Sequence, residues 1–403
     1  MTNILQNALK KGKPSPKEIL ETEKKANSFL AKLNLNLKNA RAIVGGSFAK
    51  GTWLKGRHDV DVFAMFPDDN GISDKLEKAL LKTFGKAERV HGSRDYFQIR
   101  YLGLDFEIVP ALEIDNFRKA KNVTDVSPLH IQWVLCHLGD KLRDDARLAK
   151  MFAKSSGCYG AETYIKGFSG YVLEILIAYY NGFENLVKSA VKWKEGDVIN
   201  ISGADVHIDK NKLSSLVVVD PAQPGRNANA ALSPEKFEKF KEHCRKFISH
   251  KRMEFFVERK IKLKDLSKHD IVFIAEALDG KRDIVGTKLL KAFSEIGNRI
   301  EKEGFGIAEM DWHWKEGEKA YFWYDVWRKK LSAEKKHYGP PLSRKINLLQ
   351  FRQKYKGHQT GVENGRAFAV VRREFTDVFE FAKHLIESER VKGNAKRIKI
   401  TSE

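Results

Sequence analysis

The spacing of apolar side chains along the chain predicts a mixture of helices and strands. Residues 15–33 begin with the cap-like sequence Ser-Pro-Lys-Glu and continue with apolar residues about one helical turn apart, at Ile19, Leu20, Ala26, Phe29, Leu30 and Leu33. This spacing places them on one face, so an amphipathic helix is expected there. Further helices are expected at residues 72–84, 127–152, 159–191, 233–249 and 288–304.

Runs of β-branched and aromatic residues predict strands between these helices. Strands are expected at residues 41–45, 60–66, 96–109, 213–220, 255–257 and 271–275, and the stretch 306–331 is β-rich. The last stretch contains Trp312, Trp314, Phe322, Trp323, Tyr324 and Trp327. Such aromatic density is usually core packing and less often a stacking surface for bases. The basic residues 392–399 are expected to be a solvated or flexible terminus.

The segment Ile43 to Phe63, IVGGSFAKGTWLKGRHDVDVF, combines a glycine-rich turn with paired carboxylates. Gly45 and Gly46 permit a tight turn, and Ser47 then opens a helix whose first N–H groups attract phosphate. Asp59 and Asp61 are two positions apart on a strand, so they share one face. Two carboxylates so placed can hold a pair of Mg²⁺ ions for an in-line phosphoryl displacement. The segment therefore predicts metal-dependent nucleotidyl transfer.

A third carboxylate is expected from the strand-forming stretch Tyr96 to Ala111, YFQIRYLGLDFEIVPA, which carries Asp105 and Glu107. These two residues also share a face. An Asp-x-Asp strand alone fits a solvated edge strand equally well. The Gly-Ser loop about a dozen residues upstream, together with a second acidic strand, favours the metal site.

These motifs resemble the catalytic palm of the DNA polymerase β nucleotidyltransferase superfamily. Later stretches, in the same order along nearly the whole chain, resemble the class I, archaeal-type CCA-adding enzymes: SPLHIQWV from Ser127, RLAK from Arg147, YGAE from Tyr159, IKGFSGY from Ile165, DPAQPGRNANAAL from Asp220 and GPP from Gly339. The resemblance implies an α+β fold. Its parts are a nucleotidyltransferase palm sheet with flanking helices at 1–140, a mainly helical central domain with nucleotide-contacting residues at 141–252, and α/β body and tail domains for tRNA binding at 253–403.

The resemblance also implies residues that contact the nucleotide. It matches His130 to a nucleotide-contacting histidine, Lys50 and Lys150 to basic residues near the triphosphate, and Tyr159 to a tyrosine near the sugar or phosphates. Arg226 matches an arginine implicated with the nucleobase and the acceptor end, where its rigid fork of donors suits a base edge or a phosphate. The plainer alternatives are a packed helix histidine, a solvated lysine, a core tyrosine and an arginine that stabilises the turn after Pro224.

The sequence departs from the family pattern at the third carboxylate. Alignment on Ile108-Val109-Pro110 puts Glu107 where the family usually has aspartate, and Asp105 where it often has glutamate. We favour Glu107 as the third ligand beside Asp59 and Asp61, because its spacing to Pro110 matches that of the family's third carboxylate, with Asp105 second.

Composition is compatible with a nucleic-acid enzyme without establishing one. The chain has 73 Lys and Arg against 53 Asp and Glu, a formal net charge of +20, which favours an anionic polymer but suits a ribosomal or membrane-surface protein equally. Its three cysteines, Cys136, Cys158 and Cys244, lack a metal-ligand spacing and suggest a cytoplasmic protein. The longest apolar run, residues 171–180, is too short to span a membrane and contains Glu174.

The resemblance implies a CCA tRNA nucleotidyltransferase that builds or repairs the 3′-terminal CCA of tRNA from CTP and ATP, without a nucleic-acid template, and releases pyrophosphate. The expected partners are the acceptor stem and T-arm half of tRNA, and a homodimer is possible. Two alternatives stay open. One is another RNA nucleotidyltransferase, a poly(A) polymerase or an oligoadenylate synthetase-like enzyme. The other is a catalytically inactive basic RNA-binding protein.

Overall fold

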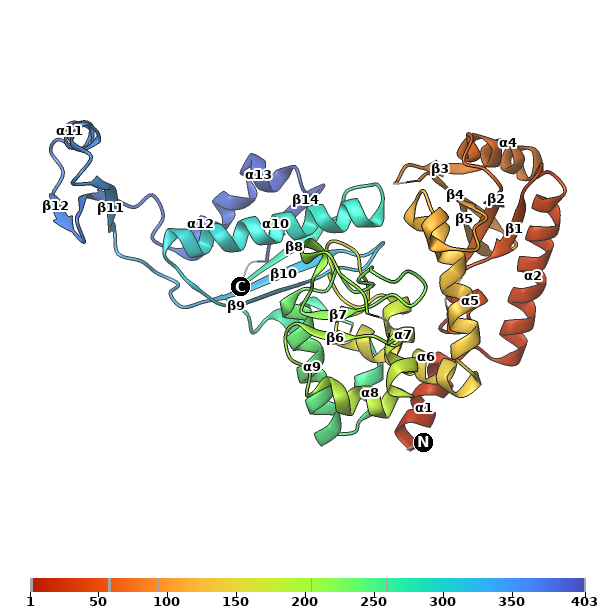
Figure 1. The fold of residues 1–403 in the computed structure, drawn as a ribbon. Helices are drawn as coiled ribbons and strands as arrows, with labels where there is room; N and C mark the ends of the chain where they lie inside the picture. Colours follow the sequence, from red (N-terminus) through yellow and green to blue (C-terminus); the bar gives the residue numbers. More distant parts are fainter. Residues whose placement is uncertain (1–2, 57–58, 93, 204, 259, 402–403) are drawn as a thin grey trace. The chain divides into compact units, whose positions relative to one another are not determined.

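The chain folds into two compact units, residues 1–259 and 260–403. The structure is a computed structural model, and it describes residues 3–56, 59–92, 94–203, 205–258 and 260–401. Both units combine helices with β-sheet (Figure 1). The α+β fold class expected from the sequence is confirmed.

A five-stranded sheet forms the N-terminal part of the first unit, in the order β1-β2-β5-β4-β3. Its strands are β1 (Arg41–Val44), β2 (Asp59–Phe66), β3 (Glu88–Val90), β4 (Tyr96–Tyr101) and β5 (Leu104–Leu112). The central pair, β2 and β5, is parallel, whereas the other neighbouring strands are antiparallel. The two acidic strands of the sequence are therefore direct neighbours.

Helices α2 (Pro16–Asn34) and α4 (Ile72–Phe84) cover one face of this sheet. The expected cap of α2 is confirmed: the Ser15 N–H donates to the Glu18 carboxylate at 2.7 Å, and the Glu18 N–H donates to Ser15 Oγ at 3.2 Å. Phe29 stacks on Phe84 and on Phe106, with ring centroids 4.5 and 4.0 Å away. This packing buries one face of the sheet and leaves the carboxylates to the other.

Residues 96–109, expected as one strand, instead form the hairpin of β4 and β5. Leu102 and Gly103 both adopt positive φ, at 49° and 80°, as a two-residue hairpin turn of the I′ kind requires. The alternation of apolar and polar residues continues through the turn, so Gly103 is its only local signal. The hairpin puts Asp105 and Glu107 on the returning strand beside β2.

The rest of the first unit is mainly helical. Its helices are α1 (Asn3–Gly12), α5 (Ser127–His137), α6 (Asp140–Ser155), α7 (Gly170–Tyr180), α8 (Phe183–Ala190) and α9 (Pro234–Ser249). They share a core with a small parallel sheet of β6 (Asp197–Ile199) and β7 (Leu216–Val218). The helix expected from Ser233 to Ser249 is confirmed, with the Ser233 hydroxyl accepting from the Lys236 N–H at 3.2 Å.

Three expectations for this region are wrong in detail. Residues 127–152 form two helices, because Leu138 is extended and Gly139 starts the next helix. Residues 159–169 are not helical; Tyr159 and Phe168 form a β-bridge, and Lys166 adopts a positive φ of 57°. Residues 255–257, expected as a strand, overlap a 3₁₀ turn at Met253–Phe256 that packs into the helical core.

The second unit contains a four-stranded sheet in the order β14-β8-β10-β9. Its strands are β8 (Ile271–Glu276), β9 (Ile307–His313), β10 (Ala320–Val326) and β14 (Arg397–Ile400), and they pack with α10 (Arg282–Glu303), α12 (Val378–Ile386) and α13 (Glu389–Lys392). The basic terminus is therefore not free as expected, since residues 397–400 pair with β8. Core packing of the aromatic stretch is confirmed for Phe322 and Tyr324, both fully buried, whereas Trp327 is 74% exposed.

A separate three-stranded sheet, in the order β11-β13-β12, also belongs to the second unit and was not expected from the sequence. It consists of β11 (Glu334–Pro341), β12 (Thr360–Glu363) and β13 (Arg366–Arg372), with α11 (Lys345–Lys354). Its small core of Phe351, Ala367 and Ala369 is distinct from that of the four-stranded sheet. Within this unit the module stands apart from α10 and the larger sheet (Figure 1).

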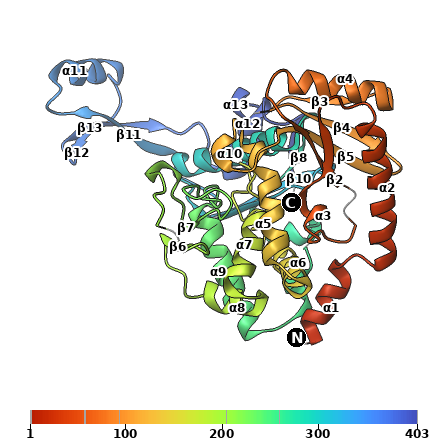
Figure 2. The ribbon, with the colours of Figure 1, turned by 45° about the vertical axis from the view of Figure 1, so that its right-hand side comes forward.

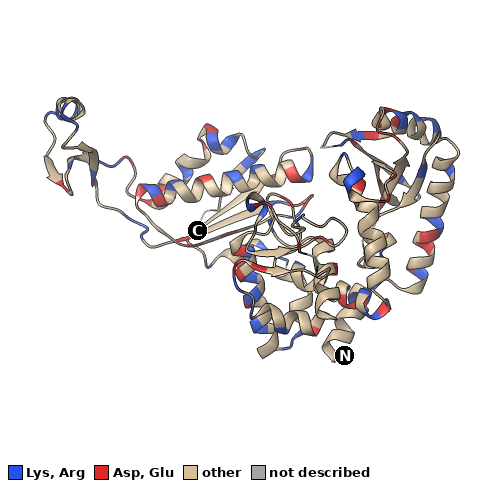
Figure 3. Cartoon of the chain, viewed as in Figure 1, with Lys and Arg blue, Asp and Glu red and all other residues tan. Residues whose placement is uncertain are grey.

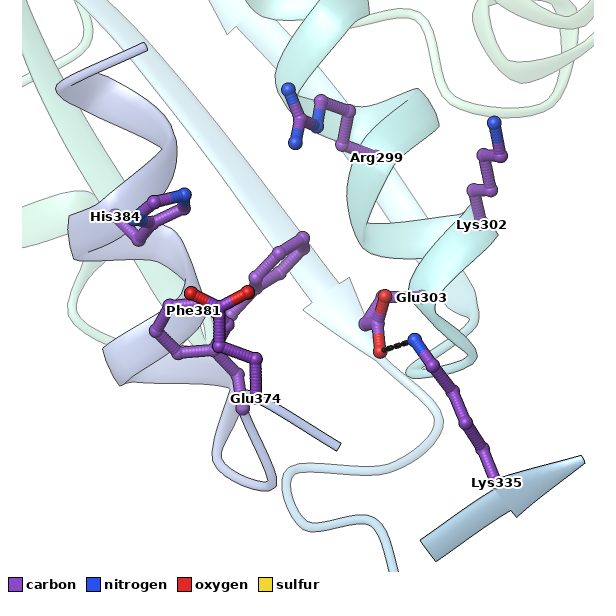
Figure 4. A pocket seen from close by; sticks show the side chains of 8 residues that line it. Arg299, Lys302, Glu303, Lys335, Glu374, Phe381 and His384 are labelled. Carbon is purple, nitrogen blue, oxygen red and sulfur yellow. Dashed lines mark hydrogen bonds and ion pairs between the residues drawn. The ribbon is translucent and has the colours of Figure 1, made fainter. Parts of the chain in front are cut away.

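Glu303, at the end of α10, connects the two sheets of the second unit. Its carboxylate lies 2.6 Å from Lys335 Nζ on β11 and 3.0 Å from Arg373 Nη1, just after β13. Glu303 and Lys335 border a pocket of about 150 Å³, to which Arg299 and Lys302 of α10 also contribute (Figure 4). The contact ties the smaller sheet to the body of this unit.

Basic residues occur throughout both units rather than in one of them (Figure 3). Among the described residues, no helix combines the length and the apolar character that crossing a membrane requires.

Candidate active site

Asp59, Asp61, Asp105 and Glu107 occupy paired positions on the central strands. In the parallel register of β2 and β5, Asp59 is opposite Asp105 and Asp61 is opposite Glu107. The alternating residues of both strands, such as Val60 and Phe106, are buried against α2 and α4. All four acidic side chains therefore project from the opposite face of the sheet, away from α2 and α4.

Asp61 and Glu107 sit in a partly desolvated and electrostatically repulsive setting. Burial raises the pKa of Asp61, with a further increase from Asp59 that Lys50 opposes. Burial also raises the pKa of Glu107, and the charges of Asp61 and Asp59 add to the effect. Carboxylates that repel each other in this way are stabilised by a bound cation.

The surroundings of the two candidates on β5 differ. Asp105 is paired across the hairpin with Arg100, whose guanidinium lies 3.4 Å from its carboxylate, and both side chains are at least half exposed. Glu107 is instead opposite Asp61 and interacts electrostatically with Asp61 and Asp59. The side chains have not converged on one ion position: among the described residues, no three His, Cys, Asp or Glu side chains form a group that could hold a metal.

The glycine loop lies directly against Asp61. Gly45 N–H donates to the Asp61 carbonyl at 2.7 Å, and α3 (Gly46–Ala49) follows at once. A Cβ on Gly46, which has φ +56°, would overlap the Asp61 carboxylate, and one on Gly45 would lie 2.6 Å from the Phe63 ring. The Gly-Gly pair is thus needed for this close approach. Figure 2 shows α3 beside β2 and α5, and Ser47 is the second residue of this short helix.

Lys50 and Lys150 are buried and both contact Glu174 of α7. Lys50 Nζ is 2.9 Å from Glu174 Oε2, and Lys150 Nζ is 2.7 Å from Oε1. Thr52 Oγ1 donates to the same carboxylate at 2.5 Å and accepts from Lys150 at 2.8 Å. Lys150 is therefore not the solvated cation of the plainer alternative, and Lys50 is buried as well.

Arg147, one helical turn before Lys150 on α6, holds the segment that follows the loop. Its guanidinium donates to the carbonyls of Gly51 and Trp53, at 2.5 and 3.0 Å. Its Nη1 donates to the Asp144 carboxylate at 2.6 Å. The segment after α3 is therefore fixed to α6 by main-chain contacts as well as through Lys150.

A second buried carboxylate, Asp220, gathers His130 and Arg226. His130 Nε2 and Arg226 Nη1 lie 3.0 and 2.7 Å from Asp220 Oδ2, and the Tyr171 hydroxyl donates to Oδ1 at 3.0 Å. Burial alone would raise the pKa of Asp220, but His130 and Arg226 outweigh it and lower the pKa. Asp220 is fully buried, whereas the Arg226 side chain remains 34% exposed. Its other donors can reach a ligand.

Tyr171 joins the two networks. Its ring stacks on His130, with centroids 4.1 Å apart, and lies 4.9 Å from Lys50 Nζ. Tyr159 belongs to the same neighbourhood: a Cβ on Gly170 would lie 3.1 Å from its hydroxyl and 3.3 Å from Lys150 Cε. The nucleotide-contacting candidates thus form a connected group that reaches the carboxylates through Lys50.

Glu174, Thr52, Asp220 and Tyr171 were not among the candidates taken from the sequence. Glu174 had a usable signal, because a single charge inside the apolar run of residues 171–180 requires a buried partner. Asp220 starts the DPAQPGRNANAAL stretch that drew attention to Arg226. Tyr171 ends the IKGFSGY stretch that carries the resemblance, which could have drawn attention to it, whereas Thr52 has no such signal.

Three family models match consecutive parts of the chain. They are the nucleotidyltransferase domain at residues 23–125, the second domain of tRNA nucleotidyltransferase at 144–257, and the C-terminal domain of the CCA-adding enzyme at 269–400. A CCA-adding enzyme of Nanoarchaeum equitans is 34% identical over 93% of this chain and 95% of its own. The chain belongs to the CCA-adding enzyme family.

Other CCA-adding enzymes give the same result. That of Sulfurisphaera tokodaii is 30% identical over 93% of this chain and 89% of its own, and that of Methanosarcina acetivorans is 29% identical over 85% and 78%. The structure of a cytoplasmic RNA terminal U-transferase matches 64% of this chain and 98% of its own, with a TM-score of 0.50 and 13% identity, a likeness of fold alone. As a member of the CCA-adding enzyme family, the chain is a CCA tRNA nucleotidyltransferase, and the two alternative functions are not favoured.

Proposed function

We propose that this CCA-adding enzyme transfers nucleotides at a site where Asp59, Asp61 and Glu107 hold two Mg²⁺ ions. The observation that carries the proposal is the register of β2 and β5, which sets Asp61 opposite Glu107 directly beside the Gly45-Gly46 turn. Carboxylate oxygens are the ligands that Mg²⁺ prefers, and a bound cation would offset the burial and the mutual repulsion that raise the pKa of Asp61 and Glu107. When bound, the ions would activate the terminal 3′-hydroxyl of tRNA and neutralise the leaving pyrophosphate.

Glu107 is the third ligand in this proposal, and Asp105 is not. The register with Asp61 and the electrostatic contact with Asp59 support Glu107. The ion pair between Asp105 and Arg100 supports a structural role for Asp105 on the hairpin.

The chain's own polar groups bind and orient the substrates. Ser47, Lys50, Lys150 and Tyr159 would contact the triphosphate and sugar of CTP or ATP, because they surround the loop next to Asp61. His130 and Arg226 would face the base and the acceptor end of tRNA. Their shared anchor on Asp220 keeps both side chains in one orientation.

Further parts of the assignment rest on the family. We propose that residues 1–140 form the catalytic domain, 141–252 the central domain and 253–403 the parts that bind the acceptor stem and T-arm half of tRNA. We also propose a cytoplasmic location, which is compatible with the three free cysteines. The possible homodimer stays a prediction of the same kind.

The product of the reaction tests the proposed function. tRNA that lacks its three terminal nucleotides is incubated with Mg²⁺ and with CTP and ATP, separately and together, and the products are sequenced. We expect CTP alone to add two residues, and the mixture to add C-C-A and then stop. A run of A residues would contradict the proposal and would indicate a poly(A) polymerase.

Asp61→Ala tests the site in the same assay. We expect nucleotide incorporation to be abolished while tRNA binding, measured by filter retention, stays near that of the wild type. Retained turnover would contradict the role of Asp61 as a ligand.

A further inference from the structure

Glu174 is a buried charge in the middle of an otherwise apolar helix. It is 1% exposed, and the α7 residues around it, from Val172 to Ile177, are buried as well. A carboxylate loses most of its hydration there, so its charge is retained only where other groups compensate.

Two lysines from different parts of the chain compensate that charge. Lys50 comes from the end of α3 and Lys150 from α6, and each gives its ammonium to a different oxygen of Glu174. Burial acts to raise the pKa of Glu174, but Lys150, Lys50 and the Thr52 hydroxyl overcome it and hold the pKa at about 2. Glu174 is therefore ionised at neutral pH.

The cluster of Glu174, Lys50 and Lys150 carries more positive than negative charge. Two ammonium groups face one carboxylate, although a single lysine would suffice for a neutral buried pair. The side chains of Lys50 and Lys150 are only 10% and 3% exposed, so water screens the surplus poorly. Lys50 directly follows α3, the short helix that begins at Gly46, so its charge lies next to the glycine loop and opposes the rise that burial gives the pKa of Asp61. An incoming polyphosphate would balance the surplus charge.

We propose that Glu174 is a positioning residue, which holds Lys50 and Lys150 at fixed points beside the glycine loop so that both ammonium groups meet the triphosphate of CTP or ATP. This inference rests on the proposed function. Thr52 supports the arrangement, because its hydroxyl bridges Lys150 and Glu174. Lysine is a flexible point charge, and fixing it beforehand reduces the entropy lost when phosphate binds.

Steady-state kinetics of Glu174→Gln separate positioning from a role in folding. Glutamine keeps the shape of the side chain and removes its charge. We expect KM for CTP and for ATP to rise by about tenfold to a hundredfold, the loss that one charge-assisted hydrogen bond gives, with a smaller change in kcat and none in KM for tRNA. A merely structural role would lower the active fraction and leave KM unchanged.

Asp145→Asn is the matched control. Asp145 is another buried carboxylate of α6, 8% exposed, and it accepts from the Phe183 backbone rather than from the lysines. Burial raises the pKa of Asp145, so loss of its charge should not unfold the protein, and we expect KM for either triphosphate to stay unchanged. An equal rise in KM for both variants would overturn the proposal.

A double-mutant cycle with Lys150→Met tests whether Glu174 acts through that lysine. If it does, Glu174→Gln should raise KM much less in the Lys150→Met background than in the wild type. Fully additive effects would overturn the proposal.

Thr52→Val provides the measurement if Glu174→Gln does not fold. It removes one hydroxyl and preserves volume, and it should raise KM for the triphosphates in the same direction but less strongly. An unchanged KM in a folded Thr52→Val protein would contradict the bridging role.

The outcomes separate this inference from the proposed function. If the wild type itself incorporates neither CTP nor ATP, the proposed function fails. If the wild type is normal and Glu174→Gln leaves KM unchanged, only the positioning role of Glu174 is rejected.

Discussion

Buried ionisable side chains in the first unit take their protonation states from contacts that are remote in sequence. Glu174 stays ionised through Lys50 and Lys150, and Asp220 through His130 and Arg226. His243 Nε2 lies 3.1 Å from the uncharged Ser155 hydroxyl, and its ring lies among those of Phe152 and Phe255, with centroids 4.3 and 4.9 Å away.

The burial of His243 predicts that the folded protein loses stability in mild acid. Burial lowers its pKa from 6.5 to about 4, so the unfolded chain takes up a proton there before the folded chain does. Its contribution is fully present above pH 6.5 and falls as the pH drops towards 4, by about 1.4 kcal/mol per pH unit. Urea unfolding across this range should show a shallower fall for His243→Gln than for the wild type. His250→Gln, an exposed control at the end of α9, should keep the wild-type slope; a slope equal in all three proteins would contradict the assignment.

The sequence identified site residues by their chemistry but not their partners. Asp59 and Asp61 could be chosen because period-two spacing on a strand makes side chains share a face and a glycine-rich turn precedes them. Glu107 was preferred to Asp105 only through the family resemblance, from its spacing to Pro110.

No local pattern encodes the packing of α3, α6 and α7. It is this packing that brings Lys50 and Lys150 together at Glu174. The same limit hid Thr52, whose residue type is common in helices and loops.

At the scale of elements, amphipathic helices were the most predictable features. α2, α4 and α9 follow from apolar spacing and capping residues, and the structure places them within a residue of the expected ends. The β4–β5 hairpin was missed because alternation continues through Leu102 and Gly103. Strand β14 was missed because its residues, Arg397–Ile400, alternate charged and apolar side chains within a basic tail, and only pairing with β8 orders them.

The ion pairs of Glu303 predict that the three-stranded sheet is tethered to α10. Glu303→Gln removes the charge that pairs with Lys335 and Arg373, so local opening of β11 and β13 should cost about 1 kcal/mol less. Hydrogen–deuterium exchange should then speed up in residues 334–341 and 366–372 but not in β8 or β10.

Glu363→Gln is the control for this experiment. It removes an exposed partner of Lys336 within the same sheet and should leave exchange almost unchanged. Equal acceleration by both variants would show that Glu303 has no special linking role.

For the whole molecule, composition indicated a partner class and the motifs indicated the family. A net charge of +20 favours an anionic polymer, but the ordered series of motifs was needed to separate a tRNA nucleotidyltransferase from other basic proteins. The α+β class followed from the mixture of periodicities. The three-stranded module did not, because β11 is mostly polar and ends in Gly339-Pro340-Pro341, and only Phe351, Ala367 and Ala369 form the buried core.

The proposed metal site is tested most directly by comparing Glu107→Gln with Asp105→Asn. The measurement is single-turnover incorporation of CTP, with Mg²⁺ in excess and with tRNA that lacks its terminal CCA. The two residues are neighbours on one face of β5, but only Glu107 is opposite Asp61. We expect Glu107→Gln to slow incorporation about a hundredfold or more, as loss of a main electrostatic contact does, while Asp105→Asn stays close to the wild type. Near-normal incorporation by Glu107→Gln would show that Glu107 is not a metal ligand.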